Sequence, residues 1–131
     1  MKQTRNTAQK KLIMELMRDN HTHPTADELY ETARAHDAHI SRGTVYRNLN
    51  QLDEASDLRK LPMPMGPDHF DCRLDNHYHF LCRSCLKVFD TELEYEDALN
   101  SVPQGLDGFI TEWHRLILVG LCAECAKGMK N

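Results

Sequence analysis

The sequence predicts an α+β protein made of a helical N-terminal domain that ends in a β-hairpin and a C-terminal α/β domain. Three apolar stripes at helical spacing occupy the first half of the chain, and two Cys-x-x-Cys pairs bracket strand-like segments in the second half. Charge separates the same halves. Residues 1–62 have a net charge of +1 and residues 63–131 a net charge of −5, within a total of −4, which indicates two tasks in two regions.

The composition, 40% hydrophobic and 27% charged, is that of a soluble globular chain. No apolar run approaches the roughly 20 residues that a membrane-spanning helix needs, and the N-terminus lacks the pattern of a signal peptide. We therefore expect a cytoplasmic protein without a membrane partner. In that compartment cysteines stay reduced, so the five cysteines are available as thiolates.

Each N-terminal element has its own signal in the sequence. Apolar residues within 8–19 recur at helical spacing. Thr25 followed by Glu28 forms a capping box at the start of a second helix, and Ser41 is a natural N-cap for a third. Residues 58–72 then predict two short strands joined by a turn.

Three short helices followed by a hairpin are the outline of a winged helix-turn-helix, in which the third helix enters the major groove of double-stranded DNA. Polar side chains lie between the apolar positions of that helix, and two basic residues in the hairpin could contact the DNA backbone. The candidate DNA-binding residues are Arg42, Thr44, Tyr46, Arg47, Asn50, Arg59 and Lys60. The alternative is a small helical domain with a solvated polar face.

Two Cys-x-x-Cys pairs predict a closed metal site. CRSC supplies Cys82 and Cys85, and CAEC supplies Cys122 and Cys125. Four thiolates on two such turns are ligands of tetrahedral structural zinc, whose binding then contributes to folding. A redox dithiol and unrelated buried cysteines are the alternatives. Cys72 has no partner in this scheme, and we interpret it as a small buried apolar residue.

The segment between the two cysteine pairs has to fold and return to the metal. Residues 87–90 and 114–122 are strand candidates, and residues 94–103 are a short helix candidate. We expect the metal to tie the end of the resulting sheet to its start.

A second set of possible ligands, of a different chemical kind, precedes and follows the first cysteine pair. His77 and His79 alternate with Tyr78, so both imidazoles point to one face of a strand. Asp71 and Asp90 lie nearby in the sequence. Nitrogen and oxygen donors suit Fe(II), Mn(II), Zn(II) or Co(II) rather than a soft thiolate environment. The alternative is that these histidines are ordinary surface or core residues and that the aspartates cap turns.

Four segments in this order, HPTADELY, TVYRNLNQL, HFD…HYHFLCRSCLKVFD and HRLILVGLCAEC, resemble the ferric uptake regulator family of bacterial metal- and redox-responsive repressors. The resemblance runs from about Thr7 to Cys125. It implies a homodimer in which each subunit has a winged-helix DNA-binding domain, here 1–68, a hinge, 69–76, and an α/β dimerisation and metal-binding domain, 77–131.

The resemblance also implies two kinds of metal site. Cys82, Cys85, Cys122 and Cys125 would hold structural zinc. A regulatory Fe(II) or Mn(II) ion would lie between the domains, with the ligands His23, Asp71, His77, His79 and Asp90. Because a ligand from each domain lets the metal fix their relative orientation, the ion would favour the DNA-competent state.

Asp90 and the FD and DNHYH motifs resemble the peroxide-sensing branch of the family, since iron-sensing members tend to have glutamate at the position of Asp90. This likeness implies that peroxide oxidises a histidine ligand, His23 or His77, at bound Fe(II). The protein would then release DNA with a palindromic AT-rich operator, and peroxide-defence genes would be derepressed. Mn(II) would support DNA binding without the oxidation of a histidine. Such a sensor is not an enzyme. His114 falls where some iron sensors place a ligand of an extra site.

Two other functions fit parts of the pattern. An iron- or zinc-responsive repressor of the same family would use the same ligands. A zinc-dependent hydrolase needs three protein ligands and an open water position, which His77, His79 and Asp71 could supply. It also needs a general base and a substrate pocket, for which the sequence has no motif.

Overall fold

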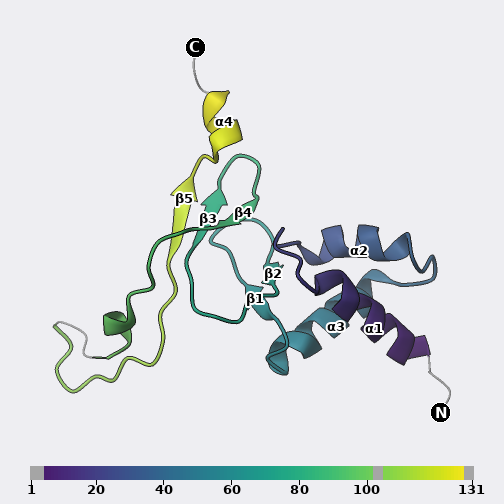
Figure 1. Cartoon of the computed structure of the whole chain (residues 1–131), viewed down its shortest axis with the longest axis horizontal. Coiled ribbons are helices and arrows are strands. Elements are labelled where there is room, and N and C mark those ends of the chain that lie inside the picture. Colours follow the sequence, from purple (N-terminus) through teal and green to yellow (C-terminus); the bar gives the residue numbers. More distant parts are fainter. Residues whose placement is uncertain (1–4, 102–104, 129–131) are drawn as a thin grey trace. The chain divides into compact units, whose positions relative to one another are not determined.

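The structure is a computed structural model that describes residues 5–101 and 105–128 (Figure 1). The chain divides into two compact units, Met1–Leu74 and Asp75–Asn131, here called the first and second units. The boundary between the units falls inside the stretch 69–76. Helices with a hairpin in the first unit and a sheet in the second confirm the α+β class.

The second and third helices of the first unit begin where their capping residues predict, and the first begins three residues before the apolar pattern at 8–19. Thr25 and Glu28 form the capping box, each side chain accepting a hydrogen bond from the backbone N–H of the other. The Ser41 hydroxyl accepts from the N–H of Thr44 at 3.1 Å. These caps satisfy N–H groups that have no partner within the helix. The helices are α1 (Arg5–Met17), α2 (Ala26–Arg34) and α3 (Arg42–Glu54).

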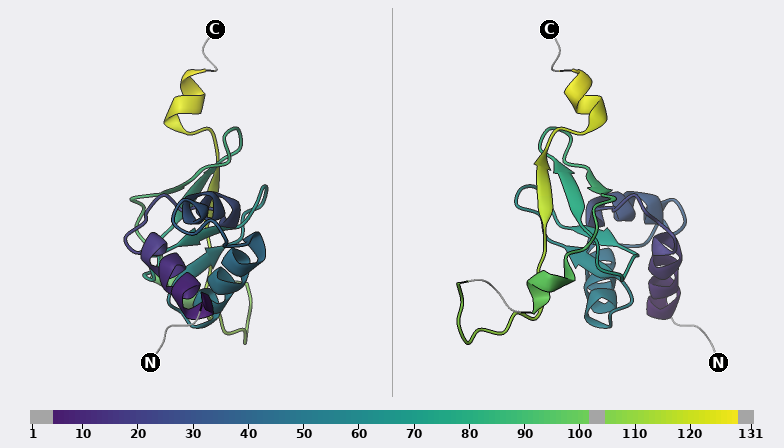
Figure 2. Two further views of the ribbon diagram at one scale, coloured as in Figure 1. Left: turned by 90° about the vertical axis from the view of Figure 1, so that its right-hand side faces the viewer. Right: turned by 60° about the vertical axis from the view of Figure 1, so that its left-hand side comes forward.

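A two-stranded hairpin completes the core of the first unit. β1 (Arg59–Leu61) pairs antiparallel with β2 (His69–Asp71). Val45 and Leu49 of α3, Ile13 of α1 and Phe70 of β2 are buried in one apolar cluster. The three helices pack against one another, and Figures 1 and 2 together show that α1 and α3 cross at a steep angle. This arrangement is the predicted winged helix.

The second unit is built on a three-stranded sheet with the order β4-β3-β5. The central strand pairs antiparallel with β4 and parallel with β5. A short helix, α4, which the sequence pattern did not indicate, follows β5 directly (Figure 1). The elements are β3 (His79–Cys82), β4 (Val88–Asp90), β5 (Ile117–Gly120) and α4 (Ala123–Lys127).

The helix expected at 94–103 was wrong in extent. Only one turn of 3-10 helix, η1 (Asp97–Asn100), forms, and residues 102–103 lie outside the described part of the chain. Four acidic side chains crowd positions 92–97, and like charges three or four residues apart destabilise a helix. The backbone N–H of Glu96 also donates to the Tyr78 hydroxyl, a contact between residues distant in the sequence.

The chain has no helix, within the residues described, that is long and apolar enough to cross a membrane.

Candidate metal centres and nucleic-acid interface

The four cysteines of the two Cys-x-x-Cys pairs come together in the second unit. Their sulfur atoms all lie within 4.8 Å of one another, and the Cys85 and Cys122 sulfurs are 3.9 Å apart. Zinc–sulfur bonds of about 2.3 Å in a tetrahedron place the sulfurs roughly 3.8 Å apart. The cluster therefore has the dimensions of a closed four-thiolate zinc site.

Local pairing explains why residues so distant in the sequence meet. In the parallel pair, Cys82 at the end of β3 lies opposite Gly120 at the end of β5. Both Cys-x-x-Cys turns therefore begin at the same end of the sheet. The N–H of Arg83 donates to the Gly120 carbonyl at 2.8 Å. Leu86, with φ of +62°, closes the CRSC turn by donating its N–H to the Cys82 carbonyl. The backbone thus presets the sulfur positions.

The cysteine thiols differ sharply in acidity. Backbone N–H groups of Cys85 and Cys122 point at the Cys82 sulfur and lower the pKa of its thiol to about 6. Hydrogen bonding to the Cys122 and Cys82 sulfurs raises the pKa of Cys125 to about 12. The thiolate is the form of cysteine that binds metal, so the lowered pKa of the buried Cys82 thiol favours metal binding at this cluster.

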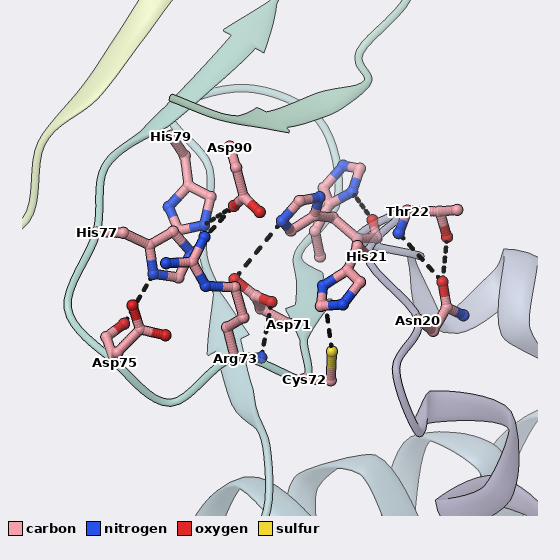
Figure 3. A network of polar contacts seen from close by, with 12 residues as sticks. Asn20, His21, Thr22, Asp71, Cys72, Arg73, Asp75, His77, His79 and Asp90 are labelled. Carbon is pink, nitrogen blue, oxygen red and sulfur yellow. Dashed lines mark hydrogen bonds and ion pairs between the residues drawn. The ribbon is translucent and has the colours of Figure 1, made fainter. Parts of the chain in front are cut away.

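A second cluster in the same unit contains His77, His79 and Asp90 (Figure 3). His79 and Asp90 are direct cross-strand partners in the β3–β4 pair. His77 lies just before β3 rather than within it, yet the centroid of its ring is 4.4 Å from that of His79, with the two rings tilted by 56°. The Nε2 atoms of His77 and His79 are 3.0 and 3.4 Å from the same Asp90 oxygen, Oδ1.

The hydrogen bonding of His77 directs its Nε2 atom toward Asp90. Nδ1 lies 2.7 Å from the Asp75 carbonyl oxygen, which can only accept, so Nδ1 carries the proton. Metal-binding histidines are usually oriented by such a bond from the other ring nitrogen. Ligand atoms about 2.1 Å from a common ion are roughly 3 Å apart. The distances from Asp90 Oδ1 to the two Nε2 atoms therefore suit ligands of one divalent ion.

The first unit holds a histidine–aspartate pair of its own, His23 and Asp71. Nε2 of His23 lies 3.5 Å from Oδ2 of Asp71, and both side chains are almost completely buried. His23 has φ of +53° immediately before Pro24, a conformation disfavoured for a residue with a side chain and for one that precedes proline. Such strain is concentrated at functional sites.

Strand β2 holds this strained residue in place. The Nδ1 of His69, a buried side chain, donates to the His23 carbonyl at 2.6 Å. The N–H of Phe70 donates to the Pro24 carbonyl at 2.9 Å. The sequence argument missed His69, although alternation along β2 places His69 and Asp71 on one face and Phe70 in the core.

Cys72 lies outside both of the metal-ligand clusters found among the described residues. Its sulfur is 3.6 Å from Nδ1 of His21 (Figure 3). Burial raises the pKa of the Cys72 thiol, and the charge of Asp71 raises it further. The thiol therefore stays protonated at neutral pH and is a poor metal ligand.

The candidate DNA-binding side chains of α3 fall into two groups. Tyr46 and Arg47 are exposed. Arg42 is also exposed, but α2 engages it: Nη1 is 2.6 Å from Asp27 Oδ1, and the guanidinium lies 4.7 Å above the Tyr30 ring. Two oppositely charged groups in contact offer less net field to a phosphate than a lone arginine does.

Arg47 opens onto a polar crevice of about 280 Å³ between α1 and α3. None of its lining residues is acidic, and two are basic. They are Asn6, Thr7, Lys10, Arg47, Asn48 and Gln51. The crevice therefore presents hydrogen-bond donors and positive charge without a competing carboxylate, the surroundings that a DNA phosphate requires.

The remaining candidates have structural contacts of their own. Thr44 accepts hydrogen bonds at its hydroxyl from Ser41 and, at 3.4 Å, from Arg47. Asn50 is half-buried. In the hairpin, Arg59 donates to the Leu74 carbonyl at 2.6 Å, and the backbone N–H of Lys60 donates to Asp53.

A winged-helix unit with exposed polar groups on its third helix, joined to a unit with a four-cysteine centre, is typical of a metal-binding transcriptional regulator. The model of the ferric uptake regulator family matches residues 1–119, and the chain belongs to this family. Family members are transcriptional regulators that bind DNA as dimers and are not enzymes, which argues against the hydrolase alternative.

Known relatives agree with this assignment. The chain is 33% identical over 121 residues to the peroxide-responsive repressor PerR of Staphylococcus saprophyticus, covering 92% of this chain and 82% of the relative. The peroxide stress regulator of Campylobacter jejuni is 25% identical with a TM-score of 0.67 (92% and 90% covered). The Helicobacter pylori ferric uptake regulator shares the fold, with a TM-score of 0.78 at 21% identity (94% and 83% covered).

Proposed function

We propose that the chain is a cytoplasmic, metal-dependent repressor that senses hydrogen peroxide. One regulatory Fe(II) or Mn(II) ion would be bound jointly by both histidine–aspartate groups, while the four cysteines hold structural zinc. The ligands of the regulatory ion would be His23, Asp71, His77, His79 and Asp90. Because the first two ligands belong to the first unit and the others to the second, binding would couple the ion to DNA affinity.

The observation that carries the proposal is the arrangement around Asp90. One carboxylate oxygen is flanked by two imidazole Nε2 atoms at 3.0 and 3.4 Å, and the orientation of His77 is fixed by a backbone carbonyl. The His23–Asp71 pair offers the same donor types from buried side chains. Three imidazole nitrogens with carboxylate oxygens suit Fe(II) and Mn(II).

Peroxide sensing is supported by the relatives and by the exposure of the second-unit cluster. The Asp90 side chain is 25% exposed whereas His77 and His79 are nearly buried, so a small oxidant has access from the aspartate side. Bound Fe(II) would allow peroxide to insert one oxygen into an imidazole C–H bond of His23 or His77, and the other oxygen would leave as water. The oxidised ring is a weaker ligand, and the coupling between the units would be lost.

The DNA-binding surface would be that of α3 with the crevice beside it, and β1 would contact the backbone. A palindromic AT-rich operator requires two copies of the chain. Large apolar side chains of the second unit are available for the dimer contact: Ile110 is 85% exposed, Trp113 68% and Phe109 64%. Burying such groups against a second copy removes them from water.

The test compares zinc-loaded protein carrying Fe(II) with the same protein carrying Mn(II). Binding to a fluorescent AT-rich palindromic duplex is followed by anisotropy before and after equimolar peroxide, and peptides are then analysed by mass spectrometry. We expect the Fe(II) form to lose DNA affinity and a peptide with His23 or His77 to gain the mass of one oxygen. The exposed His36 is the internal control for non-specific oxidation.

The same experiment separates the rival function. If the Fe(II) form keeps both its DNA affinity and its unmodified histidines, the protein is an iron-responsive repressor and the peroxide proposal is wrong. If neither Fe(II) nor Mn(II) changes DNA affinity and added Zn(II) does, the protein is zinc-responsive.

A further inference from the structure

A closed cluster of hydrogen bonds lies beside the metal-binding histidines in the second unit. Its centre is Tyr78, the residue between His77 and His79, whose side chain is 3% exposed. The Tyr78 hydroxyl lies 2.7 Å from Nε2 of His114. Tyr95 stacks on the His114 ring at 4.5 Å, and its hydroxyl accepts from Asn100 Nδ2 at 2.6 Å.

The donors and acceptors of this cluster can be assigned. Nδ1 of His114 lies 2.6 Å from the Asn100 Oδ1, which can only accept, so Nδ1 carries the proton. Nε2 of the neutral ring is then an acceptor, and the Tyr78 hydroxyl donates to it. That hydroxyl in turn accepts from the Glu96 N–H at 3.0 Å. With both ring nitrogens engaged, His114 has no lone pair left for a cation.

The cluster controls the backbone that carries the metal ligands. The His77 and His79 rings point toward Asp90, and the Tyr78 ring points toward His114. The Tyr78 carbonyl accepts from the N–H of Thr91, the residue after Asp90, at 3.1 Å. Tyr78 is therefore fixed by its side chain and its main chain on the segment whose two neighbours face the metal position.

We propose that Tyr78, held by His114, is a positioning residue that presets the His77 and His79 imidazoles for the regulatory ion, and that His114 is not itself a metal ligand. This inference rests on the proposed function, since it concerns the same site. A ligand segment already held in the binding geometry loses less freedom when the ion binds, so affinity rises.

The chain offers a matched pair of variants. Tyr78→Phe removes the hydroxyl from the ligand segment, whereas Tyr95→Phe removes a hydroxyl from the same cluster without touching that segment. Mn(II) affinity of the zinc-loaded protein is measured by electron paramagnetic resonance of free Mn(II). We expect Tyr78→Phe to weaken binding by about tenfold, as for loss of other supporting contacts of metal ligands, and Tyr95→Phe to change it less than twofold. Equal losses in the two variants would overturn the proposal.

A second readout does not depend on the regulatory metal. Ring ¹⁵N NMR of zinc-loaded protein reports the hydrogen bond that the His77 Nδ1–H donates to the Asp75 carbonyl. We expect this hydrogen bond in the wild type and in Tyr95→Phe, and its weakening in Tyr78→Phe. An unchanged His77 ring in Tyr78→Phe would contradict positioning. Failure of the wild type to bind Mn(II) would instead contradict the proposed function.

His114→Asn is the second variant, in case Tyr78→Phe fails to fold. It removes the acceptor of the Tyr78 hydroxyl from another segment of the chain. We expect it to lower Mn(II) affinity in the same direction while the ion-binding stoichiometry stays unchanged. A loss of one bound Mn(II) per chain, with the affinity of the remaining ion unchanged, would show that His114 is a ligand and would overturn the proposal.

Discussion

The four-cysteine cluster and the His77/His79/Asp90 cluster lie at opposite ends of the same strand, β3, and differ in completeness. The cysteines supply all four ligands of a tetrahedral ion from within one unit. The second cluster supplies three ligand atoms and leaves coordination positions for other groups. A complete soft site favours permanent zinc, whereas an incomplete nitrogen–oxygen site favours an exchangeable ion whose binding can be regulated.

The largest expected effect follows from breaking the complete site. Cys122→Ser removes one of four zinc ligands, and structural zinc contributes about 10–16 kcal/mol of apparent binding free energy in small domains. We expect zinc content to fall from about one ion per chain to near zero and the cooperative unfolding of the second unit to disappear. Cys72→Ser changes a cysteine outside the cluster and is the control. We expect this variant to keep its zinc, and elemental analysis measures the zinc content of both variants.

Breaking the incomplete site should leave the fold intact. His79→Ala removes an imidazole 3.4 Å from Asp90, so we expect Mn(II) affinity to fall by at least about 100-fold, more than when a supporting contact is lost. Zinc content and thermal unfolding should match the wild type. His36→Ala is the matched control at an exposed histidine. Loss of zinc in His79→Ala would show that the two sites are not separable.

A subtler change sharpens the difference between the two kinds of site. Asp90→Glu keeps the charge and adds one methylene, which displaces the carboxylate relative to both imidazoles. We expect Mn(II) affinity to change by less than about tenfold, because the donor type is kept. Histidine oxidation in the Fe(II) form should slow, as measured by the rate of oxygen incorporation. Unchanged oxidation would mean that the position of this carboxylate does not set peroxide sensitivity.

The smallest expected effects concern the two arginines of α3. Arg47→Ala should lower the salt dependence of DNA binding by about one unit of log K per log salt, as for one lost phosphate contact. Arg42→Ala should change it less, because Asp27 already neutralises that guanidinium at 2.6 Å. Binding isotherms at several salt concentrations measure both slopes. A larger change for Arg42→Ala would show that DNA displaces the α2 contact.

The parts of the fold that local chemistry determines could be predicted from the sequence. Thr25 and Ser41 mark the starts of α2 and α3 because their side chains cap N–H groups within three residues. The cysteine cluster was also predictable, since the spacing within each pair is local. Its closure depends on the parallel pairing of β3 with β5, which no local pattern encodes.

The features that depend on contacts between residues distant in the sequence could not be predicted from local patterns. In the segment 94–103, where a longer helix was expected, Glu96 donates to Tyr78, eighteen positions earlier in the chain, and no local pattern encodes that contact. The role of His69 depends on the carbonyl of His23, which is unusually oriented by a positive φ. Family resemblance, rather than spacing, identified His23 as a candidate ligand.

The shortness of β3 has a consequence for the order in which a newly synthesised chain would acquire its metals. Only Phe80 and Leu81 lie between His79, a candidate ligand of one metal, and Cys82, a candidate ligand of the other. β3 also has to pair with β5 before His79 takes its place in the sheet. A newly synthesised chain would therefore have to acquire zinc first. On the proposed function, zinc supply would set how many working sensors a cell contains, and iron and peroxide would decide only what fraction of them occupy DNA.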